Sequence, residues 1–344
     1  MAAPSEKPLL ISQGDPAGIG LELVLASWKN REQLGLPAFG LVSDPRYIAK
    51  LVQNFQWDIP IQEVSPETVS QTFRSALPVI PINSRIEGIP GHPDPATAVS
   101  TLESIETAIE LAMSGRAAGV VTNPVAKYIL FEAGFTHRAS DEFIASLTEK
   151  HSGKPAWPVL MLWSELLAVV PVTVHVPLAD IPFCLSSDII VSTASAVAQD
   201  MRNRFGIEQP RLAITGLNPH AGENGQMGTE DRDIIAPAIT LLRHRGINAR
   251  GPYSADSLFH ERARASYDVA IAMYHDQALI PIKTLAIDSA VNVTLGLPLI
   301  RTAPSHGTAF DIAGRGIGSP LSLVSAIRLA YRMARTEQPP AGGL

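Results

Sequence analysis

Short apolar runs alternate with helical patterns along most of this chain. Residues 8–12 predict a strand, and residues 14–20, rich in glycine, then form a turn before a helix that we expect from Leu21. Residues 97–113 repeat apolar side chains at helical spacing, and residues 119–122 predict the next strand. This alternation favours an α/β fold with a largely parallel, doubly wound sheet.

The length of the chain favours two domains that share a cleft. A single hydrophobic core stops growing near about 250–300 residues, and this chain has 344. Its hydrophobic fraction of 46% is sufficient for sizeable cores, so we expect a fully folded protein.

Three of the later apolar runs each lead into a histidine. The runs at residues 169–174, 212–217 and 269–274 precede His175, His220 and His275 in turn. Ligands of open α/β sheets bind beyond the carboxyl ends of the strands, so three strands would aim a histidine at the same kind of place. Imidazole suits zinc and cobalt, and three protein ligands with an open position are typical of a catalytic metal site. The spacing also allows three structural histidines that bond to backbone.

Lys283, Asn292 and Arg301 follow one another at nine-residue intervals in an otherwise apolar segment. Lys283 follows the run 280–282, and Arg301 follows the run 297–300. An arginine fork and a lysine point charge together suit a phosphate or a carboxylate. The alternative is two solvated strand ends.

Several classes of function are disfavoured by what the sequence lacks. A net charge of -6 argues against a nucleic-acid partner. No run of about 18 apolar residues predicts a membrane span, and residues 1–8 lack a signal-peptide core, so we expect a cytoplasmic location without a membrane partner. The single cysteine, Cys184, is expected to be an inert thiol. Neither the dinucleotide fingerprint G-x-G-x-x-G nor a P-loop occurs, so the residues that bind a cofactor stay unknown.

Six motifs together resemble the 4-hydroxythreonine-4-phosphate dehydrogenase family, which serves pyridoxal 5′-phosphate synthesis. They occur in order along most of the chain: GDPAGIG at 14–20, TNP at 122–124, GLNPHAGE at 216–223, MYHDQ at 273–277, VNVTLGLP at 291–298 and HGTAFD at 306–311. The histidine-bearing motifs are long, which makes the resemblance specific.

The resemblance implies two α/β/α domains with a cleft between them, related to isocitrate and isopropylmalate dehydrogenases. We expect a discontinuous terminal domain, residues 1–130 plus about 300–344, and a central domain, about 131–299. It also implies a homodimer whose active site is shared between the two chains.

The resemblance further implies which residues form the site. His175, His220 and His275 would bind one divalent metal ion, zinc, cobalt or magnesium. The substrate-binding residues of the family match Lys283, Asn292 and Arg301, and Asp256 matches a position near the substrate. Lys283, or a metal-bound water supported by Asp256 or Asp276, is the candidate base.

The reaction implied is the oxidation of 4-phosphohydroxy-L-threonine with NAD or NADP. The product, 2-amino-3-oxo-4-phosphobutanoate, decarboxylates to 3-amino-2-oxopropyl phosphate. The bound metal would lower the pKa of the substrate hydroxyl and then stabilise the enolate as carbon dioxide leaves.

One segment departs from the family pattern. Residues 138–142 read RASDE where the family has PGHTE, so Ser140 and Asp141 match the His-Thr pair that contacts the substrate. A carboxylate close to a phosphate is repulsive unless a cation such as Arg138 intervenes, and His137 could contribute if the loop takes another path.

Two alternatives to that reaction stay open. The altered pair favours a related dehydrogenase that acts on a sugar-acid phosphate or on a cyclic dihydrodiol acid. A non-catalytic binding protein on the same fold would have lost a metal ligand or part of the Lys283, Asn292 and Arg301 set, and neither is lost.

Overall fold

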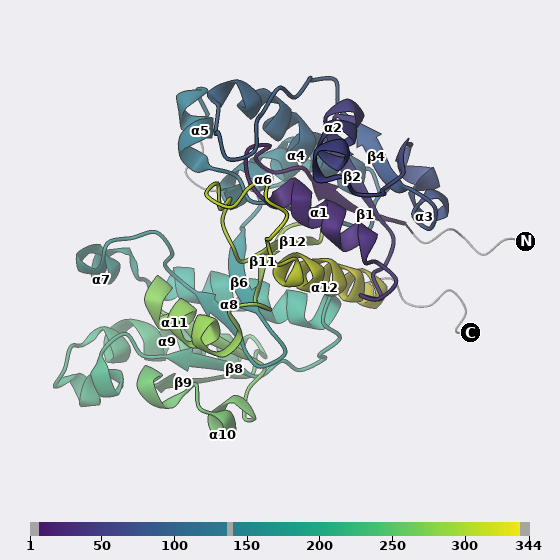
Figure 1. Cartoon of the computed structure of the whole chain (residues 1–344). Helices are drawn as coiled ribbons and strands as arrows, with labels where there is room; N and C mark the ends of the chain where they lie inside the picture. The colour runs from purple at the N-terminus through teal and green to yellow at the C-terminus, as the bar shows by residue number, and fades with distance from the viewer. Residues whose placement is uncertain (1–6, 136–139, 338–344) are drawn as a thin grey trace, which may run out of the picture. The chain divides into compact units, whose positions relative to one another are not determined.

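The computed structural model describes residues 7–135 and 140–337, with Ser140 described by its backbone alone. The chain divides into two compact units. In Figure 1 the terminal unit includes the purple and yellow ends of the colour scale, and the central unit runs from teal to green. The terminal unit contains Met1–Pro158 and Leu297–Arg335, and the central unit contains Val159–Gly296 and the C-terminal residues from Thr336. Whether these units are domains with the expected boundaries near residues 130 and 299 stays a prediction.

The described strands of the terminal unit are all paired in parallel, in the order β3-β4-β2-β1-β5-β12. They are β1 (Leu9–Ser12), β2 (Phe39–Ser43), β3 (Ile61–Glu63), β4 (Leu77–Pro81), β5 (Gly119–Thr122) and β12 (Arg301–Pro304). Every residue of β1, β2, β5 and β12 is buried, as expected for parallel strands that are covered on both faces.

Helix α2 of this unit begins where the sequence supplies the usual start signals. Asp44 caps the helix α2 by accepting a hydrogen bond from the backbone nitrogen of Arg46, and Pro45 follows at the first helical position. The helices are α1 (Gly20–Lys29), α2 (Pro45–Phe55), α3 (Val69–Thr72), α4 (Ala98–Met113), α5 (Lys127–Glu132), α6 (Ser140–Ser152) and α12 (Leu321–Glu337). Short 3-10 turns lie at η1 (Pro66–Thr68) and η2 (Pro95–Thr97). Helix α4 packs against β1, β2 and β5.

The central unit contains a mixed sheet in the order β11-β6-β7-β10-β8-β9. Its strands are β6 (Val159–Trp163), β7 (Ala168–Pro171), β8 (Leu212–Thr215), β9 (Ala249–Tyr253), β10 (Val269–Ala272) and β11 (Val291–Leu295). The pairs β11–β6 and β6–β7 are antiparallel, whereas β7, β10, β8 and β9 run parallel.

Five helices and several short turns belong to the described part of this unit. The helices are α7 (Ile181–Cys184), α8 (Ser187–Asn203), α9 (Ala236–His244), α10 (Glu261–Arg264) and α11 (His275–Ala286). The turns are η3 (Leu178–Asp180), η4 (Pro219–Gly225), the π-turn η5 (Asp231–Ile235) and η6 (Ala255–Ser257). Helix α11 packs against β6, β7 and β10, and α8 packs against α9.

The α/β class expected from the sequence is confirmed, but the alternative that Lys283 and Arg301 are two strand ends is wrong. Arg301 is the first residue of β12 and does not end a strand. Residues 280–282, which precede Lys283, belong to helix α11 and not to a strand. Three apolar residues cannot distinguish the two structures, and Pro281 disfavours a helix interior. Ala278, Ile282 and Ala286 are spaced by four residues and are buried on one side of α11, so packing overrides the local signal.

No single helix in the described part of the chain is long and apolar enough to cross a membrane. One bent pair, Leu178–Cys184 with Ser187–Asn203, passes the same test of length and composition. The cytoplasmic location stays a prediction.

Candidate functional site

Three adjacent parallel strands of the central unit carry the three histidines. In the register of the sheet Ala272 of β10 pairs with Pro171 of β7, and Ile271 pairs with Ile214 of β8. The carboxyl ends of the three strands are therefore level. His175, His220 and His275 each follow within a few residues of those ends. The sheet thus brings the three histidine-bearing segments to one edge.

Two side chains hold these strand ends together. The hydroxyl of Thr173 donates to the carbonyl oxygen of Met273 at 2.8 Å. The amide oxygen of Gln277 accepts from the hydroxyl of Thr215 at 2.7 Å and from the backbone nitrogen of Met273 at 2.7 Å. The amide nitrogen of Gln277 donates to the carbonyl oxygen of Gly216 at 2.8 Å. The segments that carry the histidines are therefore fixed by bonds beneath them.

His175 and His275 lie close enough to share a ligand. Their ring centroids are 6.0 Å apart at an interplanar angle of 40°. A metal ion about 2.1 Å from one nitrogen of each ring would place the centroids roughly 5 Å apart, so a small adjustment suffices. The Nδ1 atom of His275 lies 2.7 Å from Asp276 Oδ1, a contact that would orient the ring towards metal binding through Nε2.

His220 lies on a loop with unusual backbone geometry. Residues 220–224, in η4, have positive φ angles throughout, from 42° at Glu223 to 78° at Gly222. Each residue with a side chain in this left-handed region costs about 1 kcal/mol, so the loop needs strong support. Strain of this kind collects at functional sites.

Asp231 supplies much of that support. Its carboxylate is buried and accepts from the backbone nitrogens of Leu217 and Asn218 at 2.8 and 3.2 Å. It also accepts from the side-chain amide of Asn218 at 2.9 Å, and Glu230 accepts from the same amide at 2.7 Å. A Cβ atom on Gly216 would lie 2.4 Å from Asp231 Oδ1, so only glycine fits there.

The structure does not bring the three histidines into one preformed group. Among residues 7–135 and 140–337, no three or more histidine, cysteine or acidic side chains are placed to hold a metal ion. A hydrogen bond from the Ser254 hydroxyl and the charge of His220 keep the pKa of Asp256 below its usual range.

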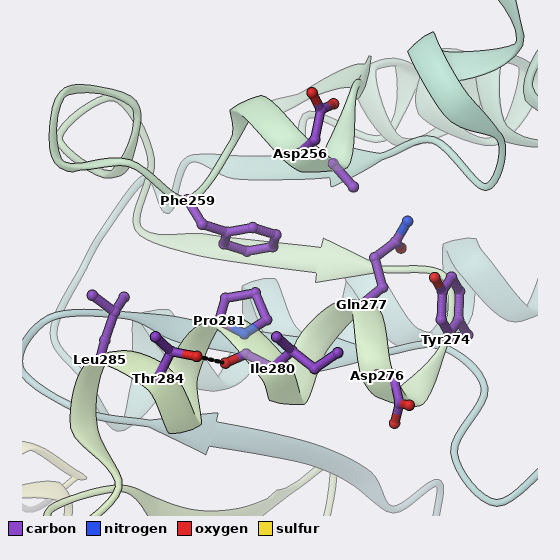
Figure 2. A pocket seen from close by; sticks show the side chains of 10 residues that line it. Asp256, Phe259, Tyr274, Asp276, Gln277, Ile280, Pro281, Thr284 and Leu285 are labelled. Carbon is purple, nitrogen blue, oxygen red and sulfur yellow. Dashed lines mark hydrogen bonds between the residues drawn. The ribbon is translucent and has the colours of Figure 1, made fainter.

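A pocket of about 430 Å³ adjoins His275. Figure 2 shows Asp256 and Phe259 on one side of it and the α11 residues Ile280 and Pro281 on the other. Its full lining is Ala255, Asp256, Phe259, Tyr274, Asp276, Gln277, Ile280, Pro281, Thr284 and Leu285. The volume suits a small molecule, and the two carboxylates favour a cationic group.

The remaining predicted residues of the central unit lie apart from the histidine pair. Lys283 is exposed on α11, eight residues after His275, which corresponds to about 12 Å of helix rise. Asn292 lies on β11, beside β6 and not beside the histidine-bearing strands. The described geometry of this unit alone does not unite them with His275.

Arg301 of the terminal unit lies in a closed polar group. Its side chain is 7% exposed, which excludes the solvated strand end considered from the sequence. Nε and Nη2 donate to the hydroxyl of Thr122 at 3.0 and 2.7 Å. Nη1 donates to Asp141 Oδ1 at 2.6 Å, where the pair forms a salt bridge.

Some predictions about residues 137–141 concern positions outside the described residues. Arg138 and His137 lie outside them, and for Ser140 only the start of α6 is described. The sequence analysis gave no individual role to Thr122, Gln277 or Asp231. Thr122 occurs in the TNP motif and Gln277 in the MYHDQ motif, so the motifs contained a signal for these two residues. No local pattern pointed to Asp231.

The geometry defines a class of protein: an α/β protein with candidate ligand-binding residues at the carboxyl ends of parallel strands. The model of the family described as pyridoxal phosphate biosynthetic protein PdxA matches residues 37–330. The chain belongs to this family.

Individual relatives agree with the family match. The chain is 53% identical over 335 residues to 4-hydroxythreonine-4-phosphate dehydrogenase of Methylorubrum populi, covering 97% of this chain and 96% of that one. It is 52% identical to the protein of that name from Bradyrhizobium diazoefficiens, covering 97% and 99%.

Solved structures show the same fold. A putative 4-hydroxythreonine-4-phosphate dehydrogenase from Salmonella typhimurium matches with a TM-score of 0.83 at 30% identity, covering 96% of this chain and 100% of that one. A terephthalate 1,2-cis-dihydrodiol dehydrogenase from Burkholderia xenovorans matches with a TM-score of 0.65 at 27% identity, covering 94% and 97%.

Proposed function

We propose that the chain is an oxidoreductase that oxidises 4-phosphohydroxy-L-threonine in pyridoxal 5′-phosphate biosynthesis. The alcohol carbon loses a hydride and its hydroxyl loses a proton, which gives 2-amino-3-oxo-4-phosphobutanoate. This β-keto acid loses carbon dioxide, and the product is 3-amino-2-oxopropyl phosphate. The observation that carries the proposal is the level arrangement of three histidine-bearing strand ends in a chain that is 53% identical to a 4-hydroxythreonine-4-phosphate dehydrogenase.

His175, His220 and His275 would hold one divalent metal ion, zinc, cobalt or magnesium, and three imidazole ligands favour zinc or cobalt among these. The 6.0 Å separation of two of the rings supports this assignment. When bound, the metal supplies a Lewis acid and NAD or NADP supplies the hydride acceptor. Thr173 and Gln277 hold the histidine-bearing segments to one another through their hydrogen bonds.

The chain's charged residues would bind the substrate and take its proton. Lys283, Asn292 and Arg301 would hold the phosphate through point charge, amide and guanidinium contacts. The lowered pKa of Asp256 keeps it ionised, which suits it to accept a hydrogen bond and makes it a weak base at neutral pH. Lys283, or a metal-bound water supported by Asp276, would therefore be the base.

We also propose a homodimer whose site uses both chains. The central unit exposes several large apolar side chains on η3, α7, α11 and the residue after α11: Leu178, Phe183, Ile280 and Ile287. A second copy would bury them. In this arrangement the His175 and His275 pair of one chain would be completed by His220 of the other.

A mixing experiment tests the shared site. His220→Ala and His275→Ala, each inactive alone, should regain activity after subunit exchange, because one site of the mixed dimer keeps all three histidines. The matched control mixes His175→Ala with His275→Ala, whose rings lie together within one chain, and should regain none. No recovery in the first mixture after verified exchange would contradict the shared site.

A dehydrogenase for a cyclic dihydrodiol acid is the second candidate. The 27% identity to a terephthalate dihydrodiol dehydrogenase and the Ser140-Asp141 departure favour it. A panel of 4-phosphohydroxy-threonine, a four-carbon sugar-acid phosphate and a cyclic dihydrodiol acid, each with NAD and NADP, separates the candidates. We expect the highest kcat/KM with 4-phosphohydroxy-threonine; a higher value with either other substrate would overturn the proposal.

A further inference from the structure

Asp141 and Thr122 accept hydrogen bonds from different nitrogens of the Arg301 guanidinium. Thr122 accepts from Nε and Nη2 of the guanidinium, and Asp141 accepts from Nη1 at 2.6 Å. The side chain of Asp141 is 26% exposed, whereas that of Arg301 is 7% exposed. The carboxylate therefore lies on the solvent side of a buried cation.

The position of Asp141 in the fold allows it to leave. Asp141 belongs to the first turn of α6, at the start of a thirteen-residue helix, and Thr122 is the last residue of the fully buried strand β5. Thr122 and Arg301 are fixed by the sheet, since β5 and β12 are paired. Asp141 instead reaches the guanidinium from a helix end with solvent access. A change of its side-chain rotamer would break the Nη1 contact, while the two bonds from Arg301 to Thr122 would remain.

We propose that Asp141 is a specificity-determining residue, a built-in carboxylate that occupies Arg301 and competes with the anionic group of the substrate. The inference rests on the proposed function only in taking Arg301 as a contact of that group. Asp141 neutralises the buried guanidinium when no anion is bound, because an unpaired buried charge is costly. An arriving phosphate must displace it, because a carboxylate and a phosphate on one guanidinium repel each other.

The competition predicts what kind of anion this chain selects. A phosphate offers several oxygens to an arginine fork and also suits the backbone nitrogens at a helix start, so it can replace a single carboxylate. A group with one weakly basic oxygen cannot. Asp141 thus lowers the affinity of Arg301 for anions in general, and only anions with several strongly accepting oxygens displace it.

The test is the binding of inorganic phosphate to the full chain, measured by calorimetry in a phosphate-free buffer. Asp141→Asn keeps an oxygen acceptor for Arg301 and removes the competing charge. We expect it to bind phosphate at least about fivefold more tightly than wild type, which equals about 1 kcal/mol. Arg301→Gln in the Asp141→Asn background should abolish the gain.

Asp188→Asn is the matched control, because Asp188 also lies in the first turn of a helix, α8, and is exposed. It changes the net charge equally and should leave phosphate affinity unchanged. Asp141→Thr is the second variant and should show the same gain as Asp141→Asn. Equal affinity in wild type and both Asp141 variants would overturn the proposal, as would an equal gain in Asp188→Asn.

Two further outcomes are also decisive. If both Asp141 variants fail to fold by circular dichroism, the carboxylate is a fixed structural partner and cannot be a displaceable competitor, which overturns the inference. If the wild type fails to oxidise 4-phosphohydroxy-threonine but the phosphate gain is present, the proposed function fails while the competition at Arg301 stands.

Discussion

The two candidate ligand-binding regions of this chain are built in opposite ways. In the terminal unit, Arg301 is buried and its guanidinium nitrogens are bonded to Thr122 and Asp141. In the central unit, bonds hold the strand ends, but His175 and His220 are exposed and the three histidines do not form one group in the described structure. In the described residues, Arg301 belongs to a hydrogen-bonded group, whereas the three histidines do not form one group.

The difference shows how each region can contribute to function. A closed group controls binding by competition, because a ligand must replace a partner that is already present. The three histidines lie on fixed strand ends, and in the proposed function a metal ion or a second subunit would bring them together. Mutations should therefore change specificity in the terminal unit and change metal binding or turnover in the central unit.

The largest effect is expected from His275→Ala. Loss of a metal ligand should remove several kcal/mol of transition-state stabilisation and reduce turnover about a thousandfold, with the fold intact. Turnover, metal content and circular dichroism measure this. His244→Ala, an exposed histidine in the last turn of α9, is the control and should be unchanged. Normal turnover with full metal occupancy in His275→Ala would remove it from the site.

Asp231→Ala tests whether the loop with positive φ angles positions His220. The backbone nitrogens of Leu217 and Asn218 lose their acceptor, so the free energy of unfolding should fall by about 2–3 kcal/mol. Urea unfolding measures the loss, and metal affinity should fall with it because His220 lies on the same loop. Asp231→Asn keeps one acceptor oxygen and should lose less. Unchanged metal affinity in a destabilised Asp231→Ala protein would show that the loop does not position His220.

Thr122→Val tests the closed group from its buried side. Two donors of Arg301 lose their acceptor, which should cost about 2 kcal/mol of unfolding free energy and raise the Michaelis constant. Thr122→Ser retains the hydroxyl and should behave as wild type. A Michaelis constant that stays unchanged in Thr122→Val would separate Arg301 from substrate binding.

The smallest effect is expected from Ser140→His with Asp141→Thr, which restores the family's pair. The Michaelis constant for 4-phosphohydroxy-threonine should fall about tenfold, or about 1.4 kcal/mol, because the competing carboxylate is gone. If the double variant instead loses the native activity, this segment recognises a different group, and a related substrate replaces the proposed one.

Sequence patterns predicted the regular elements well and the contacts between distant segments poorly. The strand at residues 119–122 and the strand ends before the histidines follow from local apolar runs. The pairing of Arg301 with Asp141 joins residues 160 positions apart, so no local spacing reveals it. Residues 280–282 have an ambiguous pattern that tertiary packing resolved as a helix. The left-handed run at His220 depends on Asp231, whose role is visible only in the folded loop.

The most direct test is the formation of reduced nicotinamide from 4-phosphohydroxy-threonine by metal-stripped protein as a divalent metal is added back. The three-histidine site predicts no turnover without metal, recovery that saturates at one ion per chain, and no recovery in His220→Ala. Turnover that is independent of metal, or absent in the metal-replete wild type, would contradict the assignment of the strand-end histidines to catalysis.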